Sequence, residues 1–380
     1  MKKIYNYSID IDKKTLEQFK ECYSKDYVVS AALMPDAHLG YSAPIGSVLI
    51  TKNFIIPAWV GFDIGCGLIA IKISGKKIIK QIKENKEQIY EQVFKKIPMG
   101  AGEYNFSKQV SEKTKKNFEK ILESFKKKPY DKQVLNFLKN SSFKHLGTLG
   151  GGNHFVELSL DENEKELWLI IHSGSRGIGY FIGKKYMISA SGNKKEFEKT
   201  CPLDVKSVLG KEYLNIDNFA VKYALLNRLE IAQKFIEILE KIIGEKIKYS
   251  IWANKVHNSV VYEKSFYIHR KGATPAKKGE GGIIPGNMRD GCFLVEGLGN
   301  SKFLNSSSHG AGRKISISEA KKKYNLKDFE KIMAGVRSNV SLKTLGEIPL
   351  AYKDLFRVMD AQKKSIKIIK YLKPLINWKG

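Results

Sequence analysis

Two glycine-rich turns, each beside a histidine, hold the residues of this 380-residue chain that are best suited to chemistry. Residues 150–152 are all glycine and precede Asn153 and His154, while His172 opens a Gly/Ser-rich run that ends at Arg176. Glycine has no Cβ, so a backbone or a phosphate group can approach such a turn closely. The pattern fits either a reactive site or a glycine-rich hairpin whose two histidines serve only packing.

The segment between these two histidines predicts a β-hairpin. Residues 155–160 and 166–171 are apolar and strand-like, and residues 161–164 form an acidic turn between them. Antiparallel pairing across that turn would bring His154 and His172 together at the open end of the hairpin.

The other histidines are distributed in the same way. Seven histidines lie in glycine-rich or turn segments and none in the long amphipathic segments: His38, His145, His154, His172, His257, His269 and His309. Asp63 and Cys66 lie in the same kind of setting, so the set offers O, S and N donors to a transition metal. One thiolate can bridge two cations. The spacing fits no zinc-finger pattern, which favours a catalytic metal site, and a thiolate with imidazoles would by itself suit zinc.

His309 is set apart by its neighbours. Three serines precede it, and a Gly-Ala-Gly turn that ends at Arg313 follows it. An imidazole surrounded by phosphate-binding groups is suited to nucleophilic attack on phosphorus. The alternatives are one more metal ligand or a general base. Arg176, Arg270 and Arg313 offer bidentate contacts to phosphate.

The charge of the chain points to the same kind of partner. Sixty-six Lys and Arg residues against 39 Asp and Glu give a net charge of +27 and a pI near 9.6. Such a surplus favours a polyanion, nucleic acid or nucleotide, because each phosphate contact releases a condensed counterion. The alternative is a lysine-rich composition without such a role, since many of the lysines lie in helix-like runs that look solvated.

The elements that must position these residues alternate between strands and helices. Strands are predicted within residues 34–52 and 60–73, and helices within 76–139, where apolar residues recur at three- and four-residue spacing. The longest predicted helix covers residues 219–248, and its apolar stripe is typical of core packing. Short strands and turns follow.

Two expectations concern the last third of the chain. Residues 271–282 are rich in Gly and Lys and predict a mobile surface loop, and residues 315–371 predict a last helical section. No internal repeat or linker divides the sequence, which favours one large domain.

The cysteines and the apolar runs bear on the compartment. Cys22, Cys66, Cys201 and Cys292 are far apart and form no CxxC pair, which predicts a reducing environment. The sequence has no signal-peptide pattern and no run of 18 apolar residues. We therefore expect a soluble, cytoplasmic protein with no membrane partner.

Eight motifs, read in order, make the chain recognisable. They are FDIGCG (62–67), LGTLGGGNHFVE (146–157), HSGSRG (172–177), VHN (256–258), HRKGAT (269–274), IPGNM (284–288), SSSHGAGR (306–313) and a terminal Lys-Gly. Together they resemble the RtcB family of RNA ligases over essentially the whole chain. The resemblance implies an α+β fold, a single RtcB-like domain over residues 1–380 with central β layers, peripheral helices and a deep cleft for metal and nucleotide. It also implies two Mn²⁺ ions per chain and a GTP-dependent reaction through a histidine–GMP intermediate.

The resemblance assigns roles to residues of this chain. The matched metal ligands are Asp63, Cys66, His154, His172 and His257, with Cys66 bridging both ions. His309 matches the guanylylated histidine, and Arg176 and Arg313 are expected to stabilise phosphate charge. The residues that fall where the family holds the guanylate are Asn153, His154, Phe155, Val156, Glu157, His257, Asn258, Pro285, Gly286, Asn287, Met288, Cys292, His309, Gly310, Ala311, Gly312, Tyr352 and Lys379.

Three positions depart from the family pattern. Gly65 stands where the family usually has Asn, and Asn287 and Cys292 replace serines. The chain is also short for the family. These changes leave the metal set intact and bear on guanine contacts and RNA choice. We further expect Asp36 to orient an RNA end, and His145 and His269 to be structural.

The resulting prediction is an RNA ligase that joins 2′,3′-cyclic phosphate or 3′-phosphate ends to 5′-hydroxyl ends, in RNA repair or tRNA splicing. An archease-like or release-factor-like helper protein is a candidate partner. One alternative is a metal-dependent RNA-end phosphoesterase, which would need the five ligands but neither His309 nor GTP. The other is a non-catalytic RNA-binding homologue, which the complete ligand set disfavours.

Overall fold

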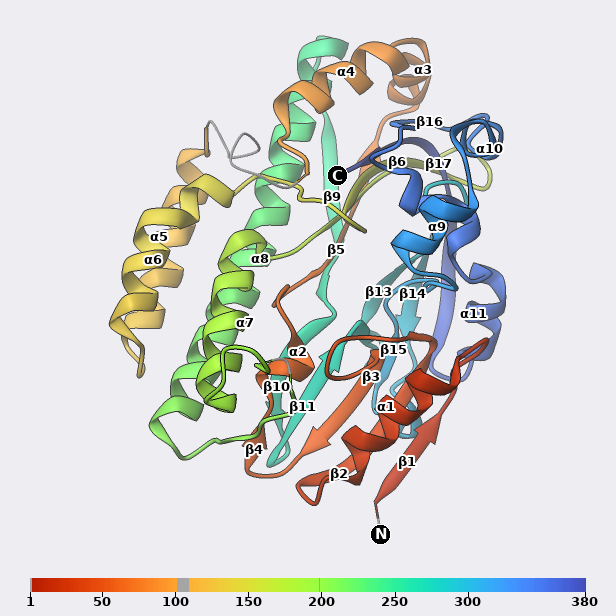
Figure 1. Ribbon diagram of the computed structural model, residues 1–380. Helices are drawn as coiled ribbons and strands as arrows, with labels where there is room; N and C mark the ends of the chain where they lie inside the picture. The colour runs from red at the N-terminus through yellow and green to blue at the C-terminus, as the bar shows by residue number, and fades with distance from the viewer. Residues whose placement is uncertain (1, 101–108, 198) are drawn as a thin grey trace.

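Two β-sheets form the framework of the molecule (Figure 1). The structure, a computed structural model, describes residues 2–100, 109–197 and 199–380. The smaller of the two sheets has five strands, in the order β1 (Lys3–Asn6), β2 (Val28–His38), β3 (Ile45–Thr51), β11 (Phe266–Lys271) and β10 (Asn258–Glu263). The β1–β2 pair is parallel and the others are antiparallel.

The larger sheet contains the predicted hairpin at its centre. Its strands run in the order β13 (Gly281–Pro285), β14 (Cys292–Gly297), β17 (Ile366–Lys379), β6 (Phe155–Asp161), β7 (Leu167–Ser173), β5 (Gly67–Ser74) and β9 (Lys248–Val256), with β16 (Arg337–Ser338) added to β17. The hairpin is confirmed, because β6 and β7 are antiparallel and Phe155 lies opposite His172.

The described residues also contain two short strand pairs and three short 3₁₀ helices. They are β4 (Phe54–Ile55) with β8 (Leu203–Asp204), β12 (Ala273–Pro275) with β15 (Ser306–Ser308), and the turns η2 (Ser301–Phe303), η3 (Leu345–Glu347) and η4 (Pro349–Ala351).

Helices cover the sheets from several sides (Figure 1). Four lie together on one flank: α5 (Glu112–Lys126), α6 (Lys132–His145), α7 (Arg176–Ser191) and α8 (Val208–Ile243). The remaining helices are α1 (Lys13–Ser24), α2 (Pro57–Val60), α3 (Lys76–Glu84), α4 (Lys86–Lys96), α9 (Ile317–Lys323), α10 (Leu326–Ile332) and α11 (Leu355–Ala361). The mixed α+β class predicted from the sequence is confirmed.

Helix α8 links the helical flank to the larger sheet. Ser207 caps its first turn through the N–H of Gly210, and Gly244, with φ of +80°, ends it in the left-handed conformation that favours glycine. Its apolar side packs on β5 and β7, where Phe235 and Leu239 are fully buried. Each such side chain contributes about 1.5–3 kcal/mol relative to exposure. The helix begins eleven residues before the predicted start at residue 219.

Two of the sequence predictions need correction. Residues 271–282 are a surface loop only in part: residues 277–279 form an exposed turn, but the segment also contains β12 and the start of β13, and Ala273 is fully buried. Residues 315–371 contain only short helices and give way at Ile366 to the 14-residue strand β17. Lysines at 367, 370 and 373 break the apolar run of β17 at helical spacing, but pairing with β14 on one side and β6 on the other makes it a strand. None of the helices in the described part of the chain combines the length and apolar composition needed to cross a membrane.

Candidate metal and nucleotide site

Two groups of potential metal ligands meet at a single cysteine. Asp63, Cys66 and His154 form one group, and Cys66, His172 and His257 form the other, with the ligand atoms of each group within 4.8 Å of one another. Cys66 Sγ lies 3.3 Å from His154 Nε2 and 3.3 Å from His172 Nε2. The sequence predicted these five ligands and a bridging Cys66, and the structure brings all five together around that thiol.

The two sheets position these ligands at their junction. Cys66 immediately precedes β5, and His154 and His172 lie at the open end of the β6–β7 hairpin. His257 stands between β9 of the larger sheet and β10 of the smaller one, so the chain crosses from one sheet to the other at a ligand. Its backbone N–H donates to the Cys66 carbonyl at 2.8 Å. The backbone that carries these ligands is therefore held by the hydrogen bonds of two sheets.

Helix α8 supports the ligand turns from behind. Arg228 is fully buried and donates from Nη1 to the carbonyls of Gly65 (3.1 Å) and Ser173 (2.7 Å), the residues that flank Cys66 and His172 in sequence. Asn227 donates from Nδ2 to the carbonyls of Thr148 and Gly174. These two polar residues fix the backbone of both ligand turns, in the way that outer contacts commonly orient a metal site.

The departure at Gly65 has a packing explanation. Its φ is +79°, and a Cβ there would lie 2.9 Å from the Ala224 Cβ and 3.0 Å from the Ala220 carbonyl oxygen of α8. The helix approaches this turn so closely that a side chain has no space. Gly65 therefore lets α8 reach the carbonyl that Arg228 holds.

The donor set fits divalent cations. Burial lowers the pKa values of His172 and His257 well below the usual range, so both imidazoles are neutral and able to bind metal. Burial, with the nearby Asp63 carboxylate second, raises the pKa of the Cys66 thiol well above its usual value. A thiolate beside a carboxylate in a buried site needs a compensating positive charge, which metal ions supply.

Asp36 holds the candidate nucleophile. Its Oδ2 accepts hydrogen bonds from His309 Nδ1 at 2.7 Å, from His309 N at 3.0 Å and from Gly310 N at 3.2 Å. Burial by itself would raise the pKa of Asp36, but the charge and hydrogen bond of His309 outweigh it and lower that pKa. Because Nδ1 faces this carboxylate, Nε2 is the ring nitrogen turned away from it. The His309 ring lies 4.9 Å from that of His257, which places the nucleophile beside the metal ligands.

This arrangement differs from the expected role of Asp36. The carboxylate is completely buried, so it contacts His309 and not an RNA end.

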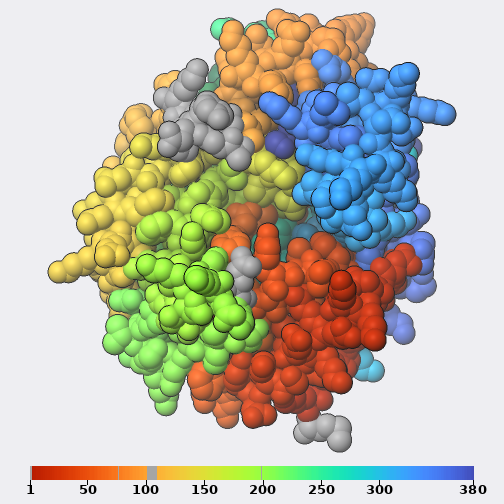
Figure 2. Space-filling model, viewed as in Figure 1, coloured from red at the N-terminus to blue at the C-terminus, as the bar shows by residue number. Residues whose placement is uncertain are grey.

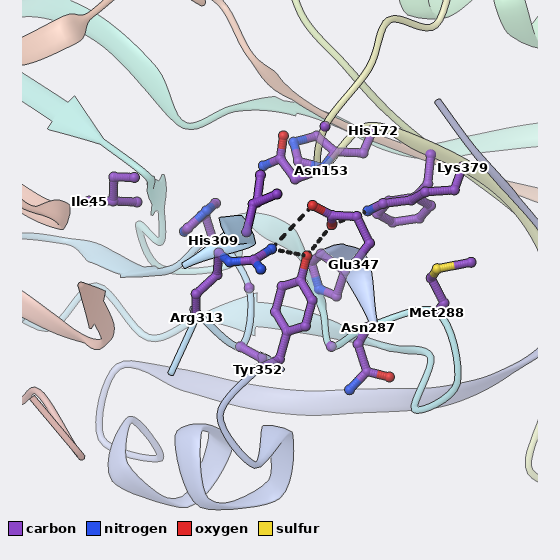
Figure 3. A pocket seen from close by; sticks show the side chains of 18 of the residues that line it. Ile45, Asn153, His172, Asn287, Met288, His309, Arg313, Glu347, Tyr352 and Lys379 are labelled. Atoms are coloured by element: carbon purple, nitrogen blue, oxygen red, sulfur yellow. Dashed lines mark hydrogen bonds and ion pairs between the residues drawn. The ribbon is translucent and has the colours of Figure 1, made fainter. Parts of the chain in front are cut away.

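A cavity of about 410 Å³ opens beside His309 (Figure 3). Its volume lies within the range of small-molecule sites. The predicted guanylate residues that line it are Asn153, Phe155, Glu157, Pro285, Gly286, Asn287, Met288, His309, Gly310, Ala311, Gly312, Tyr352 and Lys379. The cavity is also lined by His38, Tyr41, His172, Arg313 and Glu347, among others. We refer to it as the central cavity.

One wall of the central cavity is a charged cluster (Figure 3). Glu347 accepts from Arg313 Nη1 at 3.1 Å, from Lys379 Nζ at 3.0 Å and from the Tyr352 hydroxyl. Arg313 also donates to the Gly346 carbonyl at 2.6 Å and to the Tyr352 oxygen at 3.2 Å. The penultimate residue of the chain is thus tied to the same carboxylate as the arginine of the His309 motif.

Comparison with known proteins decides the family. The family profile described as tRNA-splicing ligase RtcB matches residues 18–380. The RNA-splicing ligase RtcB of Escherichia coli strain K12 is 36% identical over 368 residues, which cover 92% of this chain and 90% of that protein. The tRNA-splicing ligase RtcB of Nanoarchaeum equitans is 28% identical over 404 aligned positions, covering 86% and 83%. The chain belongs to the RtcB family of RNA ligases.

The other residues assigned by the RtcB resemblance lie around the central cavity without lining it. Val156 and Cys292 are fully buried in the larger sheet. Asn258 donates from Nδ2 to the Asp63 carbonyl at 3.2 Å and accepts from Gly272 N at 2.8 Å, so it supports a ligand turn. His154 and His257 belong to the two groups of potential metal ligands that share Cys66.

The arginines and the two remaining histidines also have definite places. Arg176 donates to Thr148 Oγ1, and its guanidinium fills space at Gly150 that a Cβ would occupy. Arg270 is buried and donates to Ser306 Oγ, away from the central cavity. His269 is structural, as expected: its Nε2 accepts from the Ile56 N–H at 3.0 Å. The His145 ring lies against Gly177.

Reasoning from sequence missed the support for this RtcB site. Asn227 and Arg228 lie inside the amphipathic helix that was interpreted as core packing, and polar residues on its buried side were the available signal. Glu347 gave no signal, because a single acid in a short-helix region resembles a solvated one. Asp36 was expected to orient an RNA end, and no local pattern linked it to His309.

Proposed function

We propose that this RtcB protein joins 2′,3′-cyclic phosphate or 3′-phosphate RNA ends to 5′-hydroxyl ends, using GTP and two divalent ions, in RNA repair or tRNA splicing. One observation carries the proposal: the Asp36-bound imidazole of His309 stands between a ligand cluster shared through Cys66 and a cavity of nucleotide size. A phosphoesterase would need no such imidazole. Manganese is the metal that the RtcB family suggests, and the donor atoms by themselves suit zinc equally.

The first step would be guanylylation of His309. Asp36, ionised and buried, keeps the proton of the imidazole on Nδ1, which leaves the lone pair of Nε2 for attack. Nε2 forms a bond to the α-phosphorus of GTP, the bond to the bridging oxygen breaks, and pyrophosphate leaves. Divalent ions held by the five ligands would supply charge stabilisation to the phosphate oxygens. Lys379 and the backbone of residues 310–312 line the cavity where that phosphate would lie.

The later steps would move GMP to the RNA. A 3′-phosphate oxygen attacks the phosphorus on His309, the N–P bond breaks, and the nitrogen lone pair returns to Nε2. The 5′-hydroxyl oxygen then attacks the activated 3′-phosphorus, loses its proton and expels GMP. A cyclic phosphate would first be opened by water. The Arg176 guanidinium lies beside the turn that precedes Asn153, and it would stabilise phosphate charge near the ligands.

RNA supplied with an already guanylylated 3′ end tests this order of steps. His309→Ala should fail to join ordinary 3′-phosphate and 5′-hydroxyl ends but should still seal the activated substrate, because the last step needs no histidine nucleophile. Its metal content should stay at the wild-type level. Joining of ordinary ends by His309→Ala would contradict the proposal. Release of the 3′-phosphate without joining by wild-type protein would favour the phosphoesterase.

A further inference from the structure

Two exposed tyrosines stand beside the metal ligands and take no part in the chemistry described above. Tyr41 is 70% exposed and Tyr180 is 53% exposed. Both contact the ring of Phe62, which immediately precedes the ligand Asp63, with ring centroids 5.8 Å and 5.2 Å apart. We call Tyr41, Phe62 and Tyr180 the aromatic patch. Large aromatic side chains left in water at a site are a mark of a binding surface.

The backbone under Tyr41 is fixed although its ring is exposed. Gln18 of α1 donates to the carbonyls of Gly40 and Tyr41 at 2.8 and 2.9 Å, and its Oε1 accepts from Gly40 N at 3.1 Å. The next residue, Ser42, shares a hydrogen bond of 2.9 Å with Thr200. A rigid backbone that presents a bare aromatic ring loses little entropy when a flat ligand packs on it.

Tyr180 is fixed in a different way. It lies on α7 one turn after Arg176, which packs against the glycine turn of the ligand hairpin. The Lys184 ammonium, one turn further along, lies 5.9 Å from the centre of the Tyr180 ring. The second tyrosine therefore combines an aromatic face with a neighbouring positive charge.

The aromatic patch lies where the central cavity opens to the surface. Tyr41 lines the central cavity and also a second hollow of about 700 Å³, which Gln18, Lys25, Lys195 and Lys199 help to line. We call this second hollow the lysine groove. Figure 2 shows the face on which the N-terminal segment, in red and orange, meets the yellow-green segment that contains α7 around a depression. A chain lying in the lysine groove would pass Tyr41 before it reached His309.

The charge of the lysine groove suits a phosphodiester chain, though only moderately. Three lysines face two glutamates, Glu21 and Glu196, and Lys199 lies 2.8 Å from Glu196. Charge alone would give weak binding, so the aromatic rings must supply much of the affinity. Stacking on aromatic side chains beside positive charge is how proteins hold single-stranded nucleic acid with little sequence preference.

We propose that Tyr41 and Tyr180 stack the unpaired nucleobases next to a reactive RNA end, while the lysine groove follows the backbone beyond them. The inference rests on the proposed function, which supplies RNA as substrate, and it adds a base-binding surface outside the metal and nucleotide residues. The patch would hold the terminal nucleotides so that the end phosphate or hydroxyl lies at the metal ligands beyond Phe62. Unpaired ends should therefore be bound better than ends buried in a duplex.

The test uses short single-stranded RNAs with 2-aminopurine as the last base, whose fluorescence falls when it stacks. One carries a 3′-phosphate and the other a 5′-hydroxyl, which distinguishes the two ends that the patch could hold. Wild-type protein should quench at least one probe. Tyr41→Ala and Tyr180→Ala should each bind that probe roughly 5- to 100-fold more weakly and quench it less. Tyr41→Phe, which keeps the ring, should stay close to wild type.

The matched control is Tyr249→Ala. Tyr249 is also about half exposed (48%), but it lies on β9 opposite Ile73, six residues along β5 from Gly67. That spacing is roughly 20 Å from the ligand end of the strand, so binding should not change. Circular dichroism melting would show that the variants fold.

Two outcomes would overturn the proposal: an unquenched probe in the wild-type complex, or equal affinity for wild type, Tyr41→Ala and Tyr180→Ala. Failure of the proposed function would look different. Wild-type protein would then form no covalent guanylate with GTP, whatever the fluorescent RNAs report about stacking.

Discussion

At the scale of single residues, substitution of Cys66 is predicted to have the largest effect on metal binding. It is shared by both ligand groups, whereas Asp63 and His257 each belong to only one. Elemental analysis after incubation with Mn²⁺ and gel filtration should therefore give two ions for wild type and about one for Asp63→Ala or His257→Ala. Cys66→Ala should retain neither ion tightly, because a bridging thiolate serves both.

Cys201→Ala is the matched control, since Cys201 is partly exposed and belongs to neither group. Its metal content should equal that of wild type. Two ions retained by Cys66→Ala would show that the thiol does not bridge.

The residue chemistry at the site was largely accessible from the sequence. The grouping of histidines with Asp63 and Cys66 suggested a catalytic metal site, and the resemblance to the RtcB family supplied the five ligands. The serine- and glycine-rich surroundings of His309 suggested a nucleophile. The partner of that nucleophile was not accessible, because Asp36 is 273 positions away and only the packing of β2 against residues 306–313 brings the two together. Long-range pairs of this kind leave no local pattern.

At the scale of elements, the approach of α8 to the ligand turns should be sensitive to one methyl group. Gly65→Ala would place a Cβ 2.9 Å from Ala224 and 3.0 Å from the Ala220 oxygen. Overpacking of this kind costs about 1–3 kcal/mol. Urea unfolding measures this loss. The free energy of unfolding of Gly65→Ala should be lower, by about 1–3 kcal/mol, than that of a control variant with the same backbone strain.

Gly192→Ala is that control. Gly192 has φ of +65°, but no atom lies within 4 Å of the position of its Cβ. Both variants therefore place alanine in the left-handed conformation, but only in Gly65→Ala does the new methyl group clash with α8. Equal losses in the two variants would contradict the close packing of α8 at the metal turn.

A second prediction for α8 concerns pH. Burial raises the pKa of Asp217 from 3.8 to about 8. Between these two pH values, Asp217 is protonated in the folded protein and ionised in the unfolded chain. The contribution of Asp217 to the free energy of unfolding therefore falls as the pH rises from about 4 to about 8. Asp217→Asn removes this loss. Its melting temperature should drop less than that of wild type between pH 5.5, inside that window, and pH 8.5, just above it.

Asp360→Asn serves as the comparison, because Asp360 is mostly exposed (74%) and pairs with Lys363 on the surface. It should follow the wild-type pH profile. A profile for Asp217→Asn that also follows wild type would mean that Asp217 is ionised in the folded protein.

The elements were predicted unevenly, for a physical reason. The β6–β7 hairpin and α8 were visible because each has a clean period, alternating or helical, that its own packing satisfies. Strand β17 was missed because its lysines recur at three-residue spacing, while its conformation is set by pairing with β14, 69 to 80 positions earlier, and with β6, more than 200 positions earlier. Residues 271–282 were interpreted as one loop because Gly and Lys dominate their composition, which hides β12 and the start of β13.

At the scale of the whole molecule, the net charge of +27 should make the affinity for RNA depend on salt concentration. The logarithm of the binding constant should fall linearly with the logarithm of salt concentration, with a slope of about −0.7 for each phosphate contacted on single-stranded RNA. Fluorescence anisotropy across a salt series measures it. An affinity that does not change between low and moderate salt would show that the positive charge of the chain does not contribute to RNA binding.

The framework also explains how one chain builds a site from distant segments. The residues that line the central cavity extend from His38 near the N-terminus to Lys379 at the C-terminus. Asp36 binds His309, and the two sheets meet at His257. The prediction that residues 1–380 fold as one domain stays a prediction, and this interdependence is its physical argument. Asp217, Asn227 and Arg228 show that the longest helix serves both the core and the site.

The most direct measurement is the location of a covalent guanylate. Wild-type protein incubated with GTP labelled at the α-phosphate and with Mn²⁺ should carry a label that survives denaturation and alkali and is lost in acid, as a phosphoramidate would be. Mass spectrometry of peptides kept at alkaline pH should place it on His309, and His309→Ala should carry none. A label on another residue, an acid-stable label, or the absence of any label in wild type would contradict the account.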